Sequence, residues 1–235
     1  MKKLKLLTLS SLAFLSTVPV FAQDADEIIS KYISAIGGAT NWGKVNTIYY
    51  EGNFEAHGTK VQIYKTIWNN KGMRLNMIAP QINAFEIVTP AEGWEFKPFL
   101  GQDKPVALTR ERLAKDADQY DAQGIFIDYK AKGHRMEYAG TATINGKQCY
   151  KIDVTHKSGK FETVYFDATS YFLIRSVGNL PGMGDVVTDF DQYTLLPEGI
   201  WFPMSISTNP GTGDVIISKI EINKSVKETI FKPVN

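Results

Sequence analysis

The sequence predicts an α+β fold that is mainly antiparallel β: an unclosed (half-open) β-barrel of about eleven strands, with helices covering its mouth. One amphipathic helix precedes a long series of short segments in which apolar and polar residues alternate, as in half-buried strands. Tight-turn sequences such as Asn145-Gly146 separate many of these segments, which is typical of antiparallel hairpins. A helical insert with apolar side chains interrupts the series once.

The first 22 residues have the composition of an export signal. Lys2, Lys3 and Lys5 precede a mostly apolar run over 6–20, and Val20-Phe21-Ala22 provides the small side chains that signal peptidase needs. The run is shorter than the roughly 20 residues of a membrane-spanning helix. No cysteine lies near the cleavage point to carry a lipid anchor. We therefore expect a soluble exported protein in which residues 1–22 are removed and 23–235 form a single domain.

The composition argues against several classes of partner and site. The chain has 26 basic and 25 acidic residues, and removal of the leader takes away three lysines and no acid, so 23 basic and 25 acidic residues remain and the net charge falls to about −2. Nucleic-acid-binding domains usually carry a basic patch, so we expect no nucleic-acid partner. The single cysteine, Cys149, excludes an internal disulfide and is expected to be a small buried side chain.

The first half begins with a helix and continues with five strands. Asp24 is a suitable N-cap, apolar residues recur at helical spacing from Ile28 to Ile36, and Gly37-Gly38 ends the helix. From Thr47 the apolar period changes to two. Strands are expected over 47–56, 61–68, 73–79, 81–89 and 93–99.

The second half consists of the helical insert and a ladder of hairpins. Thr109 is the expected N-cap of the insert, which extends over 109–129. Many antiparallel strands with short turns form either a filled sandwich or a strongly curved sheet, because a flat sheet leaves long edges exposed. The apolar helices favour the curved sheet, since an incomplete barrel has an apolar mouth to cover. Further strands are expected over 134–144, 147–155, 161–166, 171–177, 186–193, 200–208 and 215–222, before a short tail over 225–235.

The sequence contains no recognisable catalytic or metal-binding motif. No Gly-x-Ser-x-Gly elbow occurs, the histidines lack the short spacings of metal ligands, and a row of acids on one strand is expected to face solvent. We therefore expect no catalytic residues, no metal and no cofactor. The histidines are His57, His134 and His156, and the acids of the row are Asp185, Asp189 and Asp191.

The candidate binding surface is a set of apolar residues on the first strands, with methionine and aromatic side chains prominent. A dry core explains the same pattern, but apolar helices and flexible methionines favour a surface that adapts to a guest. The candidate cavity-lining residues are Ile63, Ile67, Trp68, Met73, Leu75, Met77, Phe85, Trp94, Phe96 and Phe99. The candidate lid residues are Leu113, Ala117, Tyr120, Ile125 and Phe126.

Several landmarks, taken in order, resemble the LolA-like superfamily of periplasmic lipoprotein carriers, particularly the form common in Bacteroidetes. Each landmark is weak alone, and their order and spacing over nearly the whole mature chain carry the resemblance. They are Asp26-Glu27-Ile28-Ile29, Gly93-Trp94 with Pro98, Asn145-Gly146-Lys147, Phe166-Asp167 with Tyr171-Phe172-Leu173-Ile174, and Phe231-Lys232-Pro233.

The resemblance implies a monomeric periplasmic protein whose half-open barrel holds the acyl chains of lipids or acylated lipoproteins under a helical lid. It also implies a membrane-protein donor and acceptor and a role in lipoprotein sorting to the outer membrane. Lys71 or Arg74 would correspond to a basic residue of the carriers, although Lys71-Gly72-Met73-Arg74 departs from their Arg-Pro pattern.

Two alternatives remain open from the sequence. The same fold can serve as a non-catalytic envelope sensor or interaction module. An exported hydrolase would require Asp189, Asp191 and His134 to share one cleft.

Overall fold

The structure, a computed structural model, describes residues 24–180, 184–211 and 213–233, so the expected export signal lies outside the described residues. Thirteen strands are present in this part of the chain, against about eleven expected. They are β1 (Thr47–Ala56), β2 (Thr59–Trp68), β3 (Gly72–Ala79), β4 (Ile82–Val88), β5 (Gly93–Phe96), β6 (Val106–Ala107), β7 (Arg135–Ile144), β8 (Lys147–Thr155), β9 (Phe161–Asp167), β10 (Leu173–Leu180), β11 (Gly184–Leu195), β12 (Trp201–Asn209) and β13 (Gly213–Ile222).

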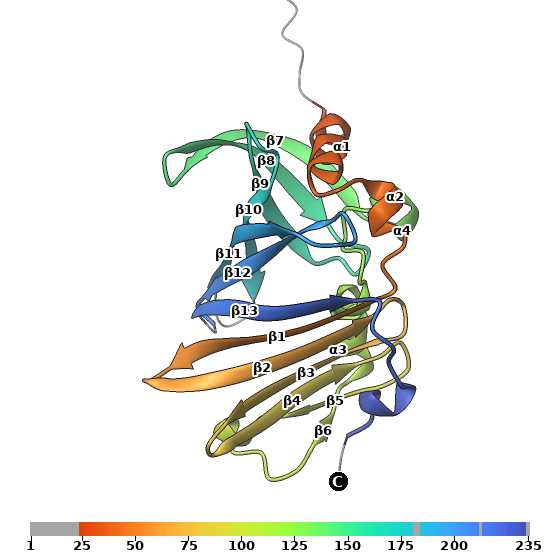
Figure 1. The fold of residues 1–235 in the computed structure, drawn as a ribbon, viewed down its shortest axis with the longest axis vertical. Helices are drawn as coiled ribbons and strands as arrows, with labels where there is room; N and C mark the ends of the chain where they lie inside the picture. Colours follow the sequence, from red (N-terminus) through yellow and green to blue (C-terminus); the bar gives the residue numbers. More distant parts are fainter. Residues whose placement is uncertain (1–23, 181–183, 212, 234–235) are drawn as a thin grey trace, which may run out of the picture.

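The strands form one antiparallel sheet in the order β6-β5-β4-β3-β2-β1-β13-β12-β11-β10-β9-β8-β7. Consecutive strands pair with one another except β6 and β7, and the pairing of β1 with β13 joins the first and second series of hairpins. Figure 1 shows the strands stacked from β7 at the top to β6 at the bottom. In the described part of the chain β6 and β7 are the two edges of the sheet, so the barrel is unclosed as predicted.

Short helices lie at one end of the strands and in the insert. They are α1 (Ala25–Ala35), α2 (Ala39–Trp42), α3 (Arg110–Lys115) and α4 (Tyr129–Lys132), with 3-10 turns η1 (Pro98–Leu100), η2 (Ala117–Tyr120) and η3 (Glu228–Phe231). Both predicted caps are confirmed: Asp24 accepts a hydrogen bond from the Asp26 amide at 3.2 Å, and Thr109 accepts one from the Arg112 amide at 3.2 Å. Among the described residues, no helix combines the length and the apolar character needed to cross a membrane.

The strand pairing is interrupted at three places in this curved sheet. The register shifts between Glu51 and Gly52, within 138–141 and within 173–175. Such bulges bend a strand and increase its twist. At the first of them a Cβ on residue 52 would lie 2.7 Å from the Ile216 carbonyl oxygen, so only glycine fits there.

The strand register separates a concave face from an outer face. Ile48, Ile67 and Met73 are paired across β1, β2 and β3 and lie on the concave face. This face carries the main core, in which buried residues from most strands pack with Ile28 and Ile29 of α1. The curved sheet therefore wraps around an apolar interior that α1 covers from one end (Figure 1).

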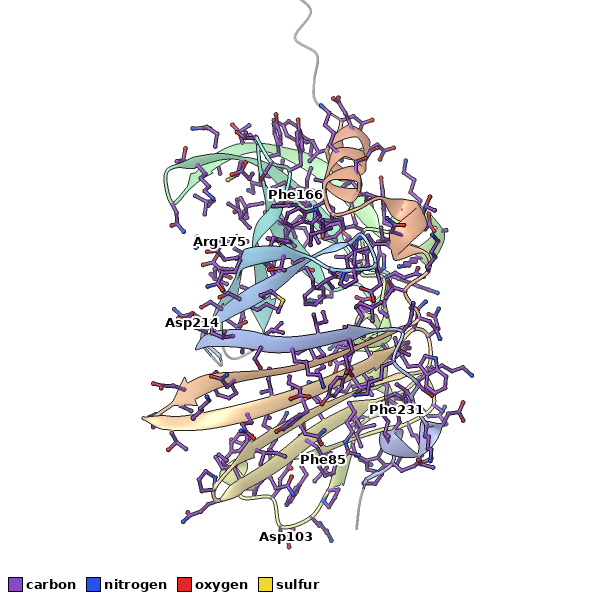
Figure 2. All side chains as sticks on the ribbon, in the orientation of Figure 1. Phe85, Asp103, Phe166, Arg175, Asp214 and Phe231 are labelled. Carbon is purple, nitrogen blue, oxygen red and sulfur yellow. The ribbon has the colours of Figure 1, made fainter. Side chains whose placement is uncertain are left out.

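The chain after β13 packs on the outer face of β2–β5. There Phe231 forms a second buried cluster with Phe85 and Ile87. Figure 2 shows Phe85 and Phe231 together in the lower part of the sheet. Arg74 of β3 fixes this segment by donating hydrogen bonds to the carbonyl oxygens of Ile230 (2.8 Å) and Lys232 (3.0 Å). The second cluster therefore lies on the opposite side of the sheet from the main core.

Candidate functional site

An apolar cavity of about 220 Å³ lies within the concave interior, between the sheet, the N-terminal helices and the segment 121–127. Tyr32 of α1, Ile36 directly after that helix and Trp42 of α2 line it, and strands from both series of hairpins form the other walls. Its lining is mostly apolar, so it is suited to hydrocarbon.

The polar atoms of two cavity-lining aromatic residues are bonded to the backbone. The Trp42 indole donates a hydrogen bond to the Ile36 carbonyl oxygen at 3.0 Å, and the Tyr193 hydroxyl donates one to the Leu173 carbonyl oxygen at 2.8 Å. Burial raises the pKa of Tyr32 and of Tyr193 well above the usual value of a phenol. These two phenols therefore stay neutral at physiological pH.

Three aromatic rings join the insert to the helix and to the sheet. The centroid of the Tyr32 ring lies 5.0 Å from that of Phe126, in an edge-on arrangement, and 4.9 Å from that of Phe166 in β9. Phe126 and Phe166 also meet edge-on at 5.5 Å. Figure 2 shows Phe166 in the upper part of the sheet, close to α1. The segment after η2 is therefore anchored where it closes the cavity.

Polar contacts attach the insert to the wall formed by the first series of strands. Glu86 of β4 lies 3.8 Å from Arg112 of α3, and Gln119 of η2 donates a hydrogen bond to it at 3.4 Å. Lys97, which follows β5, lies 3.5 Å from the same carboxylate. Glu86 pairs across the sheet with Leu75, so these contacts lie on the concave face.

A second polar contact attaches the insert to the opposite wall. The Nδ1 atom of His156, after β8, lies 2.5 Å from Asp118 of η2, and its Nε2 atom lies 2.7 Å from Glu162 of β9. Burial lowers the pKa of His156, but the hydrogen bonds to the two carboxylates outweigh burial and raise it. For the same reason the pKa values of Asp118 and Glu162 are lowered, although burial acts to raise them. The insert thus spans the interior from one wall to the other.

His134 also lies in this cluster, but it makes no contact with a carboxylate as short as those of His156. Its Nδ1 atom accepts a hydrogen bond from the Lys157 amide at 3.2 Å, and burial lowers its pKa. One ligand atom from each of Asp118, His134 and His156 lies within 4.8 Å of the others, a spacing that can hold a metal ion. Both ring nitrogens of His156 are already bonded to carboxylates, so the arrangement as it stands is a charged hydrogen-bond network.

The structure divides the predicted cavity-lining residues between two faces. Ile63, Ile67, Met73, Leu75 and Met77 lie on the concave face, where Ile67 lines the cavity and the others belong to the surrounding wall.

The predicted aromatic residues do not lie on the concave face. Trp68 pairs with Gly72, Phe85 with Phe96, and Ile87 with Trp94, and all of these lie on the outer face, against Phe231. The physical reason is the two-residue period of a strand, which sends neighbouring side chains to opposite faces. Phe99 lies in η1 rather than in a strand and is 54% exposed.

The predicted lid residues are spread along the insert. Phe126 lines the apolar cavity, and Ile125 packs against the main core. Leu113 packs over β5, where a Cβ on Gly93 would lie 2.8 Å from it. Ala117 and Tyr120 instead border a separate, more polar cavity of about 440 Å³ that also reaches Asp118 and His134.

The predicted basic residues lie away from the cavity. Lys71 lies in the β2–β3 turn, 3.7 Å from Glu228, and Arg74 lies on the outer face. The residues of the hydrolase alternative are not brought together either, since Asp189 forms a two-point ion pair with Arg175 while His134 lies beside Asp118.

Sequence reasoning missed the cavity residues of the C-terminal strands and of α2. Trp201, Phe202 and Ile206 belong to β12, which is separated from the first series of strands by β13 alone. Their alternation indicated a strand, but no local signal indicated which distant strand they would face. Trp42 lies in the four-residue helix α2, which was not expected.

Comparison with known proteins places the fold. No family model and no curated protein matches the sequence. A putative outer membrane lipoprotein-sorting protein domain from Vibrio parahaemolyticus matches 87% of this chain and 94% of its own, with a TM-score of 0.54 and 12% identity. A LolA superfamily protein from Nitrosomonas europaea matches 90% and 99%, with a TM-score of 0.57 and 11% identity.

A protein of the DUF1329 family from Desulfovibrio piger matches 88% of this chain and 97% of its own, with a TM-score of 0.54 and 11% identity. These three structures have the same fold over most of this chain at a very low level of sequence identity. The half-open antiparallel sheet of this chain therefore has the LolA-like fold.

Proposed function

We propose that this protein binds the acyl chains of lipids or acylated lipoproteins in its concave cavity and carries them through the periplasm, without a catalytic step. The observation that carries the proposal is the apolar cavity inside a half-open barrel that the insert spans from wall to wall. An acyl chain of about 14 methylenes gains roughly 11 kcal/mol from complete burial, at about 0.8 kcal/mol per methylene. An aqueous crossing therefore needs a shielded site.

The size of the cavity indicates how a ligand enters. A volume of about 220 Å³ is smaller than the roughly 300–1,000 Å³ of sites that enclose drug-sized ligands. A complete acyl chain fits only when the insert moves outward. The same movement would lower the retention energy and allow release to an acceptor.

Two further observations support a carrier. The expected leader predicts export as a single mature domain, and one structural neighbour is described as a lipoprotein-sorting protein domain. A carrier of this kind needs a donor and an acceptor in the two membranes, and we propose that the protein meets them as a monomer in the periplasm.

Native mass spectrometry of the mature protein purified from its own cell envelope tests this proposal. We expect a population carrying one co-purified lipid or acylated species, which is removed by delipidation and restored by adding acyl ligands. Consistent absence of lipid, together with failure to bind any added acyl ligand, would overturn the proposal.

The small cavity also favours a second candidate, a non-catalytic envelope sensor or interaction module with the same fold. Cross-linking in intact cells separates the two candidates. Recovery of one membrane-protein partner by a protein that never carries lipid supports the sensor, whereas lipid transfer between two membrane fractions supports the carrier.

A further inference from the structure

Lys65 is a cation on the otherwise largely apolar concave wall of β2. Its cross-strand partners are Tyr50 of β1 and Leu75 of β3, and Ile63 and Ile67 flank it on the same face of its own strand. Tyr50 and Ile63 belong to the main core, and Ile67 and Leu75 pack against it. The lysine is partly buried.

Within the described part of the chain, the ammonium group of Lys65 has neither a hydrogen-bond nor an ion-pair partner. Glu86 lies one strand beyond Leu75 in the same row, but its carboxylate is engaged by Lys97, Arg112 and Gln119. A partly buried lysine among apolar side chains loses hydration without gaining a counter-charge. The position therefore favours an anion from outside the chain.

The lysine also lies next to the apolar cavity. Ile67 lines that cavity and is two residues from Lys65 on the same face, which corresponds to about 7 Å along a strand. A molecule with its hydrocarbon end in the cavity would thus place its other end beside the ammonium group.

We propose that Lys65 binds the anionic head group of the amphiphile whose hydrocarbon chain occupies the cavity. The head group is a carboxylate or a phosphate, so the ligand class is an anionic lipid rather than a neutral one. The inference rests on the proposed acyl-binding function and adds a charge requirement to it. A lysine acts here as a point charge with three donors, which suits either head group.

The test compares three ligands that share a saturated fourteen-carbon chain: tetradecanoate, tetradecanoyl lysophosphatidate and tetradecanol. Their dissociation constants are measured with the delipidated mature protein, below their critical micelle concentrations. The variants are Lys65→Met and, as a matched control, Lys60→Met, because Lys60 lies on the same strand, exposed and on the opposite face. Melting temperatures check that each variant is folded.

For the wild type we expect about tenfold tighter binding of at least one anionic ligand than of tetradecanol, the size of one charge-assisted contact. Lys65→Met should reduce anion binding to the level of the alcohol and leave alcohol binding unchanged, and Lys60→Met should change neither. Tight tetradecanoate binding identifies a carboxylate head group, and tight lysophosphatidate binding identifies a phosphate. Raising the salt concentration should reduce the preference for the anion.

The outcomes separate the two proposals. Equal binding of acid, lysophosphatidate and alcohol by the wild type overturns the role of Lys65 and leaves acyl binding intact. Loss of alcohol binding in a folded Lys65→Met protein also overturns it, because the lysine would then shape the wall rather than bind a charge. Absence of binding for all three ligands is the failure of the proposed function itself.

Discussion

The Nδ1 atom of His156 lies 2.5 Å from Oδ2 of Asp118, and this contact joins the loop after β8 to the helical insert. The other ring nitrogen lies 2.7 Å from Glu162. An imidazole donates from both nitrogens only when it is protonated. One positive charge therefore links two carboxylates, and the polar attachment of the insert to this wall depends on the protonation of a single histidine.

Stability should therefore depend on pH through this contact. The pKa of His156 is raised above 6.5, so its contribution is fully present below about pH 6.5 and is lost as the pH rises through the raised value. The pKa values of Asp118 and Glu162 lie below 3.8 and 4.5, so their contributions are lost as the pH falls through the lowered values. We expect the contribution of this contact to the melting temperature to be largest between about pH 4.5 and 6.5 and to decrease as the pH rises above this range.

Replacing the histidine tests this assignment. In His156→Gln the alkaline decrease should be much smaller, and the loss of stability at pH 6 should be about 1.5–3 kcal/mol for each hydrogen bond to a charged group. His57→Gln is the control, because His57 is exposed in the β1–β2 turn. An unchanged pH profile in His156→Gln would assign the alkaline decrease to other groups.

The outer-face cluster should contribute to stability without contributing to ligand binding. Phe231 is buried against Phe85 and Ile87 on the side of the sheet opposite the cavity. We expect Phe231→Ala to destabilise the protein by about 3–5 kcal/mol. The affinity of the folded fraction for tetradecanoate should stay at the wild-type value.

Phe161→Ala is the matched control for the loss of an aromatic ring, since Phe161 is 53% exposed. Urea denaturation curves of both variants give the two free energies of unfolding. A change in ligand affinity in Phe231→Ala would show that the two faces of the sheet are coupled.

Local patterns were enough to predict most of the strands and the two helix caps. Alternation over β1 and β2, the Asn145-Gly146 turn and the caps at Asp24 and Thr109 all depend on residues that are close in sequence. The class of fold was therefore predictable. The two-residue strand β6 has too few residues to show a period, and it was missed.

The site was less predictable because it depends on contacts that are distant in sequence. The aromatic residues Trp68 and Trp94 were assigned to the cavity by their character, whereas strand alternation and the C-terminal segment place them on the outer face. Nothing near these residues in the sequence indicated that Phe231 would cover them. Likewise, Asp118 and His156 are 38 residues apart and meet only because the insert crosses the interior.

Filling the cavity should weaken ligand binding while leaving the protein folded. Ile67 lines the cavity, so a larger side chain at this position extends into empty volume. We expect Ile67→Phe to weaken binding of both tetradecanoate and tetradecanol by at least tenfold, with a stability change no larger than the roughly 1–3 kcal/mol of overpacking. Unaltered binding of both ligands would place the acyl site elsewhere.

Ile216→Phe is the control for this substitution, because Ile216 of β13 is 40% exposed. It enlarges a side chain by the same amount without entering the cavity. Comparing the two variants separates loss of volume in the cavity from a general effect of phenylalanine on the sheet.

Intrinsic fluorescence should report ligand binding through two of the four tryptophans. Trp42 and Trp201 line the apolar cavity, whereas Trp68 and Trp94 pack with Phe231 on the outer face. An acyl chain that enters the cavity removes water from the first pair only, so adding tetradecanoate should shift the emission to shorter wavelength. Trp42→Phe and Trp201→Phe should each reduce this shift, and Trp68→Phe and Trp94→Phe should leave it unchanged. The opposite pattern would move the ligand to the outer face, since only there do Trp68 and Trp94 share one surface.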